Sequence, residues 1–157
     1  MGERVIMNRE ILFKAKRIDN GEWVEGQYVY ITNPLTEDGK PIKHLICNGT
    51  NIFNDLINPD TLCQYTGLTD KNGKKIWEND ILKGYQYPYM YDGNDNYYAE
   101  VTWFENCPSF GIYTLKNPKS NVCGISEGNT EFMESWISED WEIIGNIFDN
   151  ADLLEVV

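Results

Sequence analysis

The stretch 62-LCQYTGLTDKNGKKIWENDILKG-84 decides the fold class that we expect for this chain. It begins with a strand-like run at residues 62–65, continues through a polar turn around Asn72 and Gly73, and then returns to an apolar pattern. Asn-Gly between two apolar runs favours a tight hairpin, because both residue types tolerate the positive φ that such a turn requires. The stretch therefore predicts short strands joined by tight turns.

Short apolar runs alternate with turn residues along the rest of the chain as well. Residues 9–32 predict a hairpin with Asn20 and Gly21 in its turn. A second hairpin and two further strands are expected at residues 99–115, 44–47 and 141–148. Gly145 lies inside the last of these strands, where glycine indicates a bulge or a close backbone approach.

Helices are expected to be few and short. The spacing of apolar residues predicts one helix at 130–137, a single helical turn at 54–57, and a last turn at 151–155 capped by Asn150. Residues 33–42 predict a turn-rich loop. The whole pattern predicts a mainly β fold with one or two short helices, either a small barrel with an SH3-like element or a rolled antiparallel sheet.

The length of 157 residues is enough for one domain with a substantial core, so we expect a single domain over residues 1–157. Met7 precedes the first strand-like run, which makes it a candidate natural start and makes residues 1–6 a candidate disordered leader. There is no secretory signal pattern and no run of 18 apolar residues, so we expect no membrane span and a cytoplasmic location in a bacterial cell.

The net charge is −12, and its distribution along the chain is uneven. Residues 127–157 contain nine acidic residues and no Lys or Arg, whereas the remainder holds 16 acidic residues against 13 basic ones. A negative field repels phosphate backbones, which disfavours general nucleic-acid binding. The acidic end predicts either a solvated face or a surface that meets a basic partner.

The four cysteines and the single histidine do not form a metal-binding pattern. A structural zinc site needs closely spaced pairs of soft ligands, and these cysteines are scattered, so we expect free thiols and no metal or cofactor. The residues are Cys47, Cys63, Cys107, Cys123 and His44.

Three carboxylates in the opening stretch, Asp70, Glu78 and Asp80, raise the alternative of acid–base or metal chemistry. Asp and Asn in turns, however, commonly accept hydrogen bonds from their own backbone. The sequence favours that structural role, and it contains no G-x-S-x-G, Walker A or G-x-G-x-x-G motif. We therefore expect no catalytic residues and no enzymatic activity.

Residues 84–98 are rich in tyrosine and predict either a surface loop or an aromatic contact surface, since Tyr is enriched at protein interfaces. Together with acidic and aromatic residues further along the chain, this loop supplies the candidate partner contacts. They are Tyr85, Tyr87, Tyr89, Tyr91, Trp136, Glu139 and Asp140.

Three blocks resemble the YopX family of phage and prophage proteins: REILFKAKRIDNGEWVEG, LCQYTGLTDKNGKKIWENDIL and WEIIGNIFDNADLLE. Residues 84–140 match that family only loosely. The chain departs from the family pattern at Asn79, where glycine is usual, and at Ala151, where proline is usual. The resemblance implies a β-rich fold and a phage or prophage origin, and it brings no established activity.

We therefore expect a non-enzymatic accessory protein that acts by protein–protein interaction or by self-assembly, as a homo-oligomer. One alternative is a nucleic-acid-binding small barrel, and another is an acidic mimic of DNA that binds a host protein. The barrel alternative relies on a local basic patch beside stacking aromatic rings. That patch would comprise Lys14, Lys16, Arg17, Lys71, Lys74 and Lys75.

Overall fold

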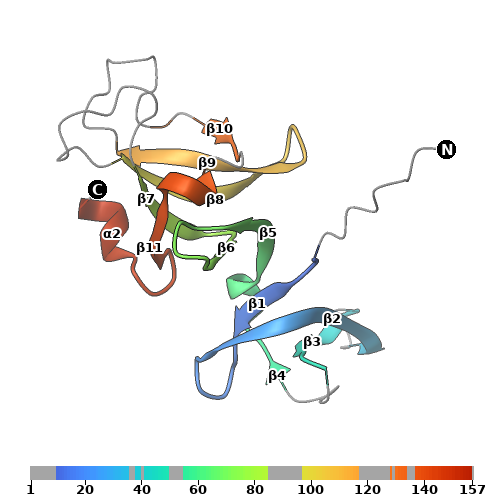
Figure 1. The fold of residues 1–157 in the computed structure, drawn as a ribbon. Helices are drawn as coiled ribbons and strands as arrows, with labels where there is room; N and C mark the ends of the chain where they lie inside the picture. Colours follow the sequence, from blue (N-terminus) through green and yellow to red (C-terminus); the bar gives the residue numbers. More distant parts are fainter. Residues whose placement is uncertain are drawn as a thin grey trace. The chain divides into compact units, whose positions relative to one another are not determined.

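The computed structural model describes residues 10–35, 38–39, 41–49, 55–84, 97–116, 128, 130–133 and 137–156. Within these residues the chain is mainly β, with two sheets and little helix (Figure 1). The strand orders are β4-β3-β2-β1-β5-β6 in the first sheet and β10-β9-β8-β7-β11 in the second. The expected mainly β fold is confirmed in the form of rolled antiparallel sheets, and the strands of the described residues do not close into a barrel.

The elements follow the chain as short strands with helical turns between some of them. The strands are β1 (Phe13–Lys16), β2 (Trp23–Leu35), β3 (Pro41–Cys47), β4 (Asp55–Leu56), β5 (Cys63–Thr69), β6 (Lys75–Trp77), β7 (Asp80–Gly84), β8 (Tyr97–Phe104), β9 (Ser109–Lys116), β10 (Thr130–Phe132) and β11 (Glu142–Asn146). The helical elements are the 3₁₀ turn η1 (Pro59–Thr61), α1 (Ile137–Asp140) and α2 (Asp152–Val156). No helix among the described residues is long and apolar enough to cross a membrane.

The chain divides into two compact units, residues 1–67 and 68–157. In the first unit, the predicted hairpin is confirmed as β1 and β2, and Gly21 takes the positive φ of 72° that its turn requires. Ala15 and Val24 face each other across this hairpin and belong to a small buried core. Its other members are Ile46 and Ile57, with Phe13, Tyr28 and Leu62 packed against them.

The second unit has its own core, centred on Trp141. The indole of Trp141 is 1% exposed and lies edge-on to the ring of Tyr97, with 5.0 Å between the ring centroids. A Cβ atom at Gly84 would come within 2.4 Å of that indole, so this position in β7 has no room for a side chain. Ile76, Leu82, Ala99, Val101 and Ile112 complete the core.

Several local predictions are wrong, and each error has a physical reason. Residues 130–132 form strand β10 instead of a helix, because pairing with β9 overrides the apolar spacing. Residues 55–56 form β4 through pairing with β3, not a helical turn. Strand β2 extends to Leu35 and β3 begins at Pro41, so strands occupy both ends of the predicted loop at 33–42.

The end of the chain confirms one prediction and corrects another. The ladder between β11 and β7 shifts register between Ile143 and Gly145, as expected for a glycine bulge. A Cβ atom at Gly145 would come within 2.4 Å of the side-chain oxygen of Asn150. That oxygen accepts a hydrogen bond from the backbone N–H of Asn146, the last residue of β11, at 3.1 Å. The Asn150 side chain therefore caps the end of the strand, and the prediction that it caps the following helix is wrong.

Two expectations lie outside the described residues: the leader at residues 1–6 and nearly all of the tyrosine-rich loop at residues 84–98. The expectation of a single domain remains a prediction.

Candidate functional site

The first group to consider is the carboxylate of Asp70, which opens the turn between β5 and β6. Its side chain is buried, and one oxygen accepts hydrogen bonds from the backbone N–H groups of Asn72 and Lys74, each at 2.9 Å. The other oxygen accepts from the N–H of Ile143 in β11 at 3.1 Å. A single carboxylate therefore closes its own turn and fixes that turn to a strand 73 residues further along the chain.

The electrostatics of Asp70 follow from these contacts. Burial by itself raises the pKa of the carboxyl, but the three backbone donors more than offset it, and the pKa lies below its ordinary value of 3.8. The carboxylate is thus held in its charged, accepting form. A general acid or base at neutral pH needs a pKa shifted towards 7, so the shift here is in the wrong direction for that chemistry.

Asp80 and Asn79 perform a similar structural task at the start of β7. Asp80 is 2% exposed and accepts a hydrogen bond from the backbone N–H of Trp77 at 2.8 Å. Asn79 adopts a φ of 69°, a left-handed conformation that glycine adopts most readily and that Asn adopts more readily than most other residues. The structural role expected for the carboxylates of this stretch is confirmed for Asp70 and Asp80.

The opening stretch and the C-terminal block are also joined through their backbones. The N–H of Lys71 donates to the carbonyl oxygen of Trp141 at 2.8 Å, and the N–H of Ile147 donates to that of Asn79 at 3.1 Å. The ammonium of Lys71 lies 3.1 Å from a carboxylate oxygen of Glu142. Two distant sequence blocks therefore form one hydrogen-bonded unit, and their polar residues are used in building the fold.

A different arrangement occurs in the second sheet at β8, β9 and β10, which lie at the opposite end of the strand order from β11. Four aromatic residues lie there, Trp103, Phe104, Tyr113 and Phe132, which we call the aromatic edge. The side chains of Trp103, Tyr113 and Phe132 are 40%, 41% and 54% exposed. Large rings are seldom left in contact with water in a cluster unless another molecule covers them.

Strand register divides the aromatic edge between the two faces of the sheet: Trp103 lies on the core-facing side beside Phe110, and the other three rings lie on the opposite side. Val101 pairs with Ile112, and both are fully buried, so this pair marks the core face of the sheet. Phe132 pairs with Gly111 and therefore lies on the opposite face, next to Phe104 with 5.8 Å between ring centroids. A Cβ atom at Gly111 would come within 2.1 Å of the Phe104 ring, so the glycine leaves the space that the ring occupies.

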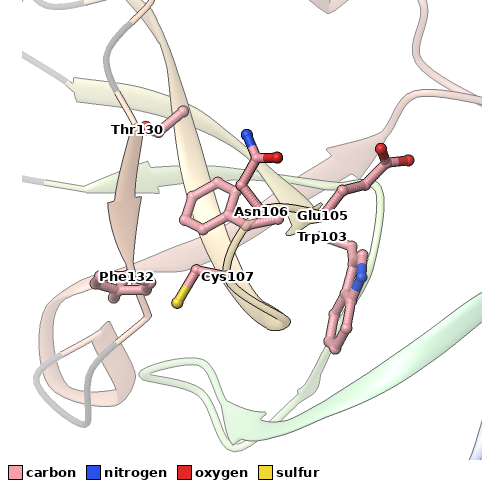
Figure 2. Close-up of a pocket in the computed structure, with 7 residues that line it drawn as sticks. Trp103, Glu105, Asn106, Cys107, Thr130 and Phe132 are labelled. Carbon is pink, nitrogen blue, oxygen red and sulfur yellow. The ribbon is translucent and has the colours of Figure 1, made fainter.

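A shallow pocket of about 430 Å³ opens at the turn that joins β8 to β9 (Figure 2). Figure 2 shows Trp103 and Phe132 on opposite sides of this turn, with Cys107 at the turn itself. The pocket is lined by Trp103, Phe104, Glu105, Asn106, Cys107, Thr130 and Phe132. Its lining combines exposed rings with one carboxylate and contains no Lys or Arg.

Two acidic residues lie beside the aromatic edge. Glu105 is exposed in the β8–β9 turn, and Glu100 is half-buried opposite Tyr113. Burial raises the pKa of Glu100 above its ordinary value of 4.5. The surface therefore offers apolar contact together with negative charge.

The structure describes only two of the contact residues expected from the sequence. Glu139 and Asp140 lie in α1, immediately before the buried Trp141, and neither lines the pocket. Tyr85, Tyr87, Tyr89, Tyr91 and Trp136 lie outside the described residues. The alternation of β8 and β9 is visible in the sequence, but the contact between Phe104 and Phe132 requires β10, which the sequence predicted as a helix.

Three of the basic residues considered for nucleic-acid binding, all in the first unit, have local partners. Arg17 pairs with Asp19 at 3.0 Å, and the ammonium groups of Lys14 and Lys16 lie 4.7 and 5.5 Å from the ring centroid of Trp23. The three belong to the first unit, whereas Lys71, Lys74 and Lys75 belong to the second.

The histidine and the cysteines show no metal-site geometry in the part of the chain that the structure describes, where no three His, Cys, Asp or Glu residues gather around one point. His44 accepts or donates at Nδ1 in a 2.7 Å hydrogen bond with the hydroxyl of Tyr28. Cys47, Cys63 and Cys107 form no disulfide bond within the described residues; Cys63 is buried and Cys107 is exposed.

Comparison with known proteins agrees with this architecture. The crystal structure of protein EF1440 from Enterococcus faecalis is similar over 92% of this chain and 98% of its own, with a TM-score of 0.50 and 23% sequence identity. This likeness concerns the fold. No curated protein matches the chain. The model of a family described as YopX protein matches residues 12–155, which include both hydrogen-bonded blocks and the aromatic edge. The chain therefore belongs to the YopX family.

Proposed function

We propose that this chain is a phage or prophage accessory protein that acts by binding another protein through its aromatic edge. The observation that carries the proposal is the exposure of Tyr113 and Phe132 on the outer face of a sheet whose other face is a closed core, with Trp103 exposed at the end of the same sheet. Exposed aromatic residues are the usual anchors of protein interfaces. Family membership supports the phage-type origin.

The polar groups of the second unit support a binding role over a catalytic one. Asp70 and Asp80 are engaged with backbone N–H groups, so the two buried carboxylates of the opening stretch are committed to the fold. The pocket beside the aromatic edge brings a carboxylate, an amide, a hydroxyl and a thiol near apolar rings. We propose that this pocket receives a side chain of the partner.

The charge of the chain favours a basic protein partner in the cytoplasm of the host bacterium. The net charge of −12 repels nucleic-acid backbones and attracts cationic surfaces. Electrostatic attraction of this kind mainly accelerates association, while the aromatic contacts slow dissociation.

The test is affinity capture from a lysate of the bacterial host with the wild-type chain and with Phe132→Ser, with and without nuclease. Phe132 is more than half exposed, so the variant is expected to fold normally. A matched control is Ile18→Ser, which removes another exposed apolar side chain, 65% exposed, from the first unit.

The expected result is a specific protein that survives nuclease, is retained by Ile18→Ser, and is reduced at least about 10-fold by Phe132→Ser, as for an interface anchor. Equal capture by both variants would contradict the proposal. Loss of all captured material on nuclease treatment would favour the nucleic-acid alternative. A captured protein that DNA displaces would favour the DNA-mimic alternative, and size-exclusion chromatography with light scattering would identify self-assembly.

A further inference from the structure

The outer face of the second sheet changes from exposed to covered along one row of residues. Strand register places Thr130 opposite Tyr113, and Tyr113 opposite Glu100. Glu100 in turn lies opposite Ile81 of β7. Residues that are opposite one another across paired strands share a face of the sheet. Tyr113 is 41% exposed and Ile81 is fully buried, so Glu100 lies at the boundary between the exposed part and the covered part.

The carboxylate of Glu100 is partly removed from water without compensation from the described residues. The side chain is half-buried, and burial raises the pKa of its carboxyl above the ordinary value of 4.5. No hydrogen bond or positive charge from the described residues counteracts this effect of burial. Lys83 lies on the same face, but strand register sets it opposite Glu142 of β11. A positive charge supplied by another molecule would therefore stabilise the ionised form of Glu100.

Exposed rings lie within reach of any molecule that contacts Glu100. Tyr113 is on the neighbouring strand, and Phe132, which is 54% exposed, is on the strand beyond it. Adjacent strands are about 4.8 Å apart, so Phe132 is about 10 Å from Glu100 across the sheet, displaced along the strands. One short segment of a protein can therefore contact the carboxylate and both rings.

We infer that a short segment of the partner places a Lys or Arg side chain against Glu100 and packs a large apolar side chain on Tyr113 and Phe132. This inference rests on the proposed function and specifies the chemistry of the partner. An ammonium or guanidinium group compensates the partly desolvated carboxylate through a charge-assisted hydrogen bond. The ring of Tyr113 offers the same cation a favourable π face.

Charge favours a basic segment of another protein over other occupants of this face. Nucleic acid presents phosphate groups, which a carboxylate repels. A second copy of the chain has the same net charge of −12, so two copies repel each other. A divalent cation takes several oxygen ligands, whereas no three His, Cys, Asp or Glu residues gather around one point in the part of the chain that the structure describes.

The probe for the experiment is a library of random linear dodecapeptides displayed on phage, selected against the full-length wild-type chain and depleted on Glu100→Gln. The expected consensus has one Lys or Arg and a large apolar residue about three or four positions apart, which is the spacing of about 10 Å in an extended segment. A synthetic peptide of that consensus, and a copy with norleucine in place of the basic residue, are titrated against each variant by fluorescence polarisation.

Glu100→Gln and Phe132→Ser are each expected to weaken binding of the basic peptide at least about 10-fold. The matched control is Glu25→Gln, which makes the same substitution at an exposed position of β2 in the first unit and should change binding less than about 2-fold. The norleucine peptide should bind wild type about as weakly as the basic peptide binds Glu100→Gln. Combining the two changes should cause little further loss, because both remove the same ion pair.

Urea denaturation separates this role from a structural one. A carboxylate that burial alone affects does not stabilise the fold, so the denaturation midpoint of Glu100→Gln is expected to equal or exceed that of wild type. Weaker binding by a variant that is at least as stable as wild type then reports a lost contact with the peptide.

The outcomes distinguish this inference from the proposed function. A lower denaturation midpoint for Glu100→Gln would show that the carboxylate has a partner within the chain and would overturn the inference. A library that yields no peptide, a consensus without a basic residue, or additive losses from Glu100→Gln and norleucine would overturn it as well. In each case the proposed function still stands if Phe132→Ser reduces the protein captured from lysate, and it fails separately if that capture is unchanged.

Discussion

The two ends of the second unit use polar and apolar residues in opposite ways. Around Asp70, a buried carboxylate satisfies three backbone donors, and the family's two most distinctive sequence blocks are hydrogen bonded to each other. Around Phe132, aromatic rings lie on the outer face of the sheet in contact with water. In the first region the polar groups form hydrogen bonds within the fold. In the second region the aromatic rings remain exposed on the surface.

This difference shows which residues are informative about function. The motif that identifies the family is rich in Asp, Asn and Lys, and by residue type alone it resembles an active site. Its contacts show that it stabilises a turn and joins strands that are far apart in sequence. The aromatic edge is the region through which we propose that a partner binds. Each of the following predictions tests one side of this contrast.

The largest effect is expected from Asp70→Ala. The variant removes a charged acceptor from three backbone N–H groups, and hydrogen bonds to charged groups are worth more than neutral ones, so we expect a loss of about 3 kcal/mol in the free energy of unfolding. Urea denaturation followed by circular dichroism and Trp fluorescence measures it. Coincident transitions in the two signals would also support the single domain expected from the sequence.

The matched control for this variant is Asp152→Ala, which removes an exposed carboxylate from the first turn of α2 and should cost less than about 1 kcal/mol. The folded fraction of Asp70→Ala is expected to capture the lysate protein as the wild-type chain does. If Asp70→Ala and its control lost the same free energy of unfolding, the Asp70 hydrogen bonds would not be important to the fold, and the difference proposed between the two regions would be wrong.

A change of pH is expected to have a smaller effect on stability, and the sign of that effect differs between Asp70 and Glu100. The pKa of Asp70 is lowered in the folded state, so its stabilising contribution is present above its ordinary value of 3.8 and is lost as the pH falls through the lowered value. The pKa of Glu100, beside the aromatic edge, is raised by burial, so ionisation of Glu100 costs stability as the pH rises through the raised value.

At neutral pH, Asp70→Asn should therefore be less stable than wild type, and Glu100→Gln should be more stable. The deficit of Asp70→Asn is expected at neutral pH and should shrink below pH 3.8, whereas Glu100→Gln should be the more stable protein at neutral pH and lose that advantage as the pH falls below the raised pKa of Glu100. Denaturation curves between neutral and acid pH measure both. Parallel pH profiles for the two variants would show that the two carboxylates are not in different environments.

The sequence predicted well wherever local chemistry determines the backbone. Asn20-Gly21 and Asn72-Gly73 indicated turns that the structure contains, with positive φ at both glycines, and Gly145 indicated the bulge in β11. These features depend on the conformational freedom of a few residues, which is visible without any knowledge of the neighbours. The buried, accepting role of Asp70 and Asp80 followed from the same turn chemistry.

The sequence failed where a partner strand decides the outcome. Thr130–Phe132 has an apolar spacing that suits a helix, yet it forms a strand because Gly111 and its neighbours in β9 offer an edge for pairing. The short segment Asp55–Leu56 becomes a strand through β3 in the same way. The aromatic edge could not be predicted for this reason, since Phe104 and Phe132 meet only when β10 is placed beside β9.

The smallest effect is expected at Asn79, where the family usually has glycine. The residue adopts a φ of 69°, which costs most residues about 1 kcal/mol and costs Asn less. Asn79→Gly is expected to change stability by less than about 0.5 kcal/mol, because relief of the backbone is offset by greater freedom in the unfolded chain, whereas Asn79→Ala should lose about 1 kcal/mol. Urea denaturation distinguishes the pair. Equal losses in both variants would mean that the Asn side chain, and not the backbone conformation, matters here, and the substitution of glycine by Asn would then be a gain of contact specific to this chain.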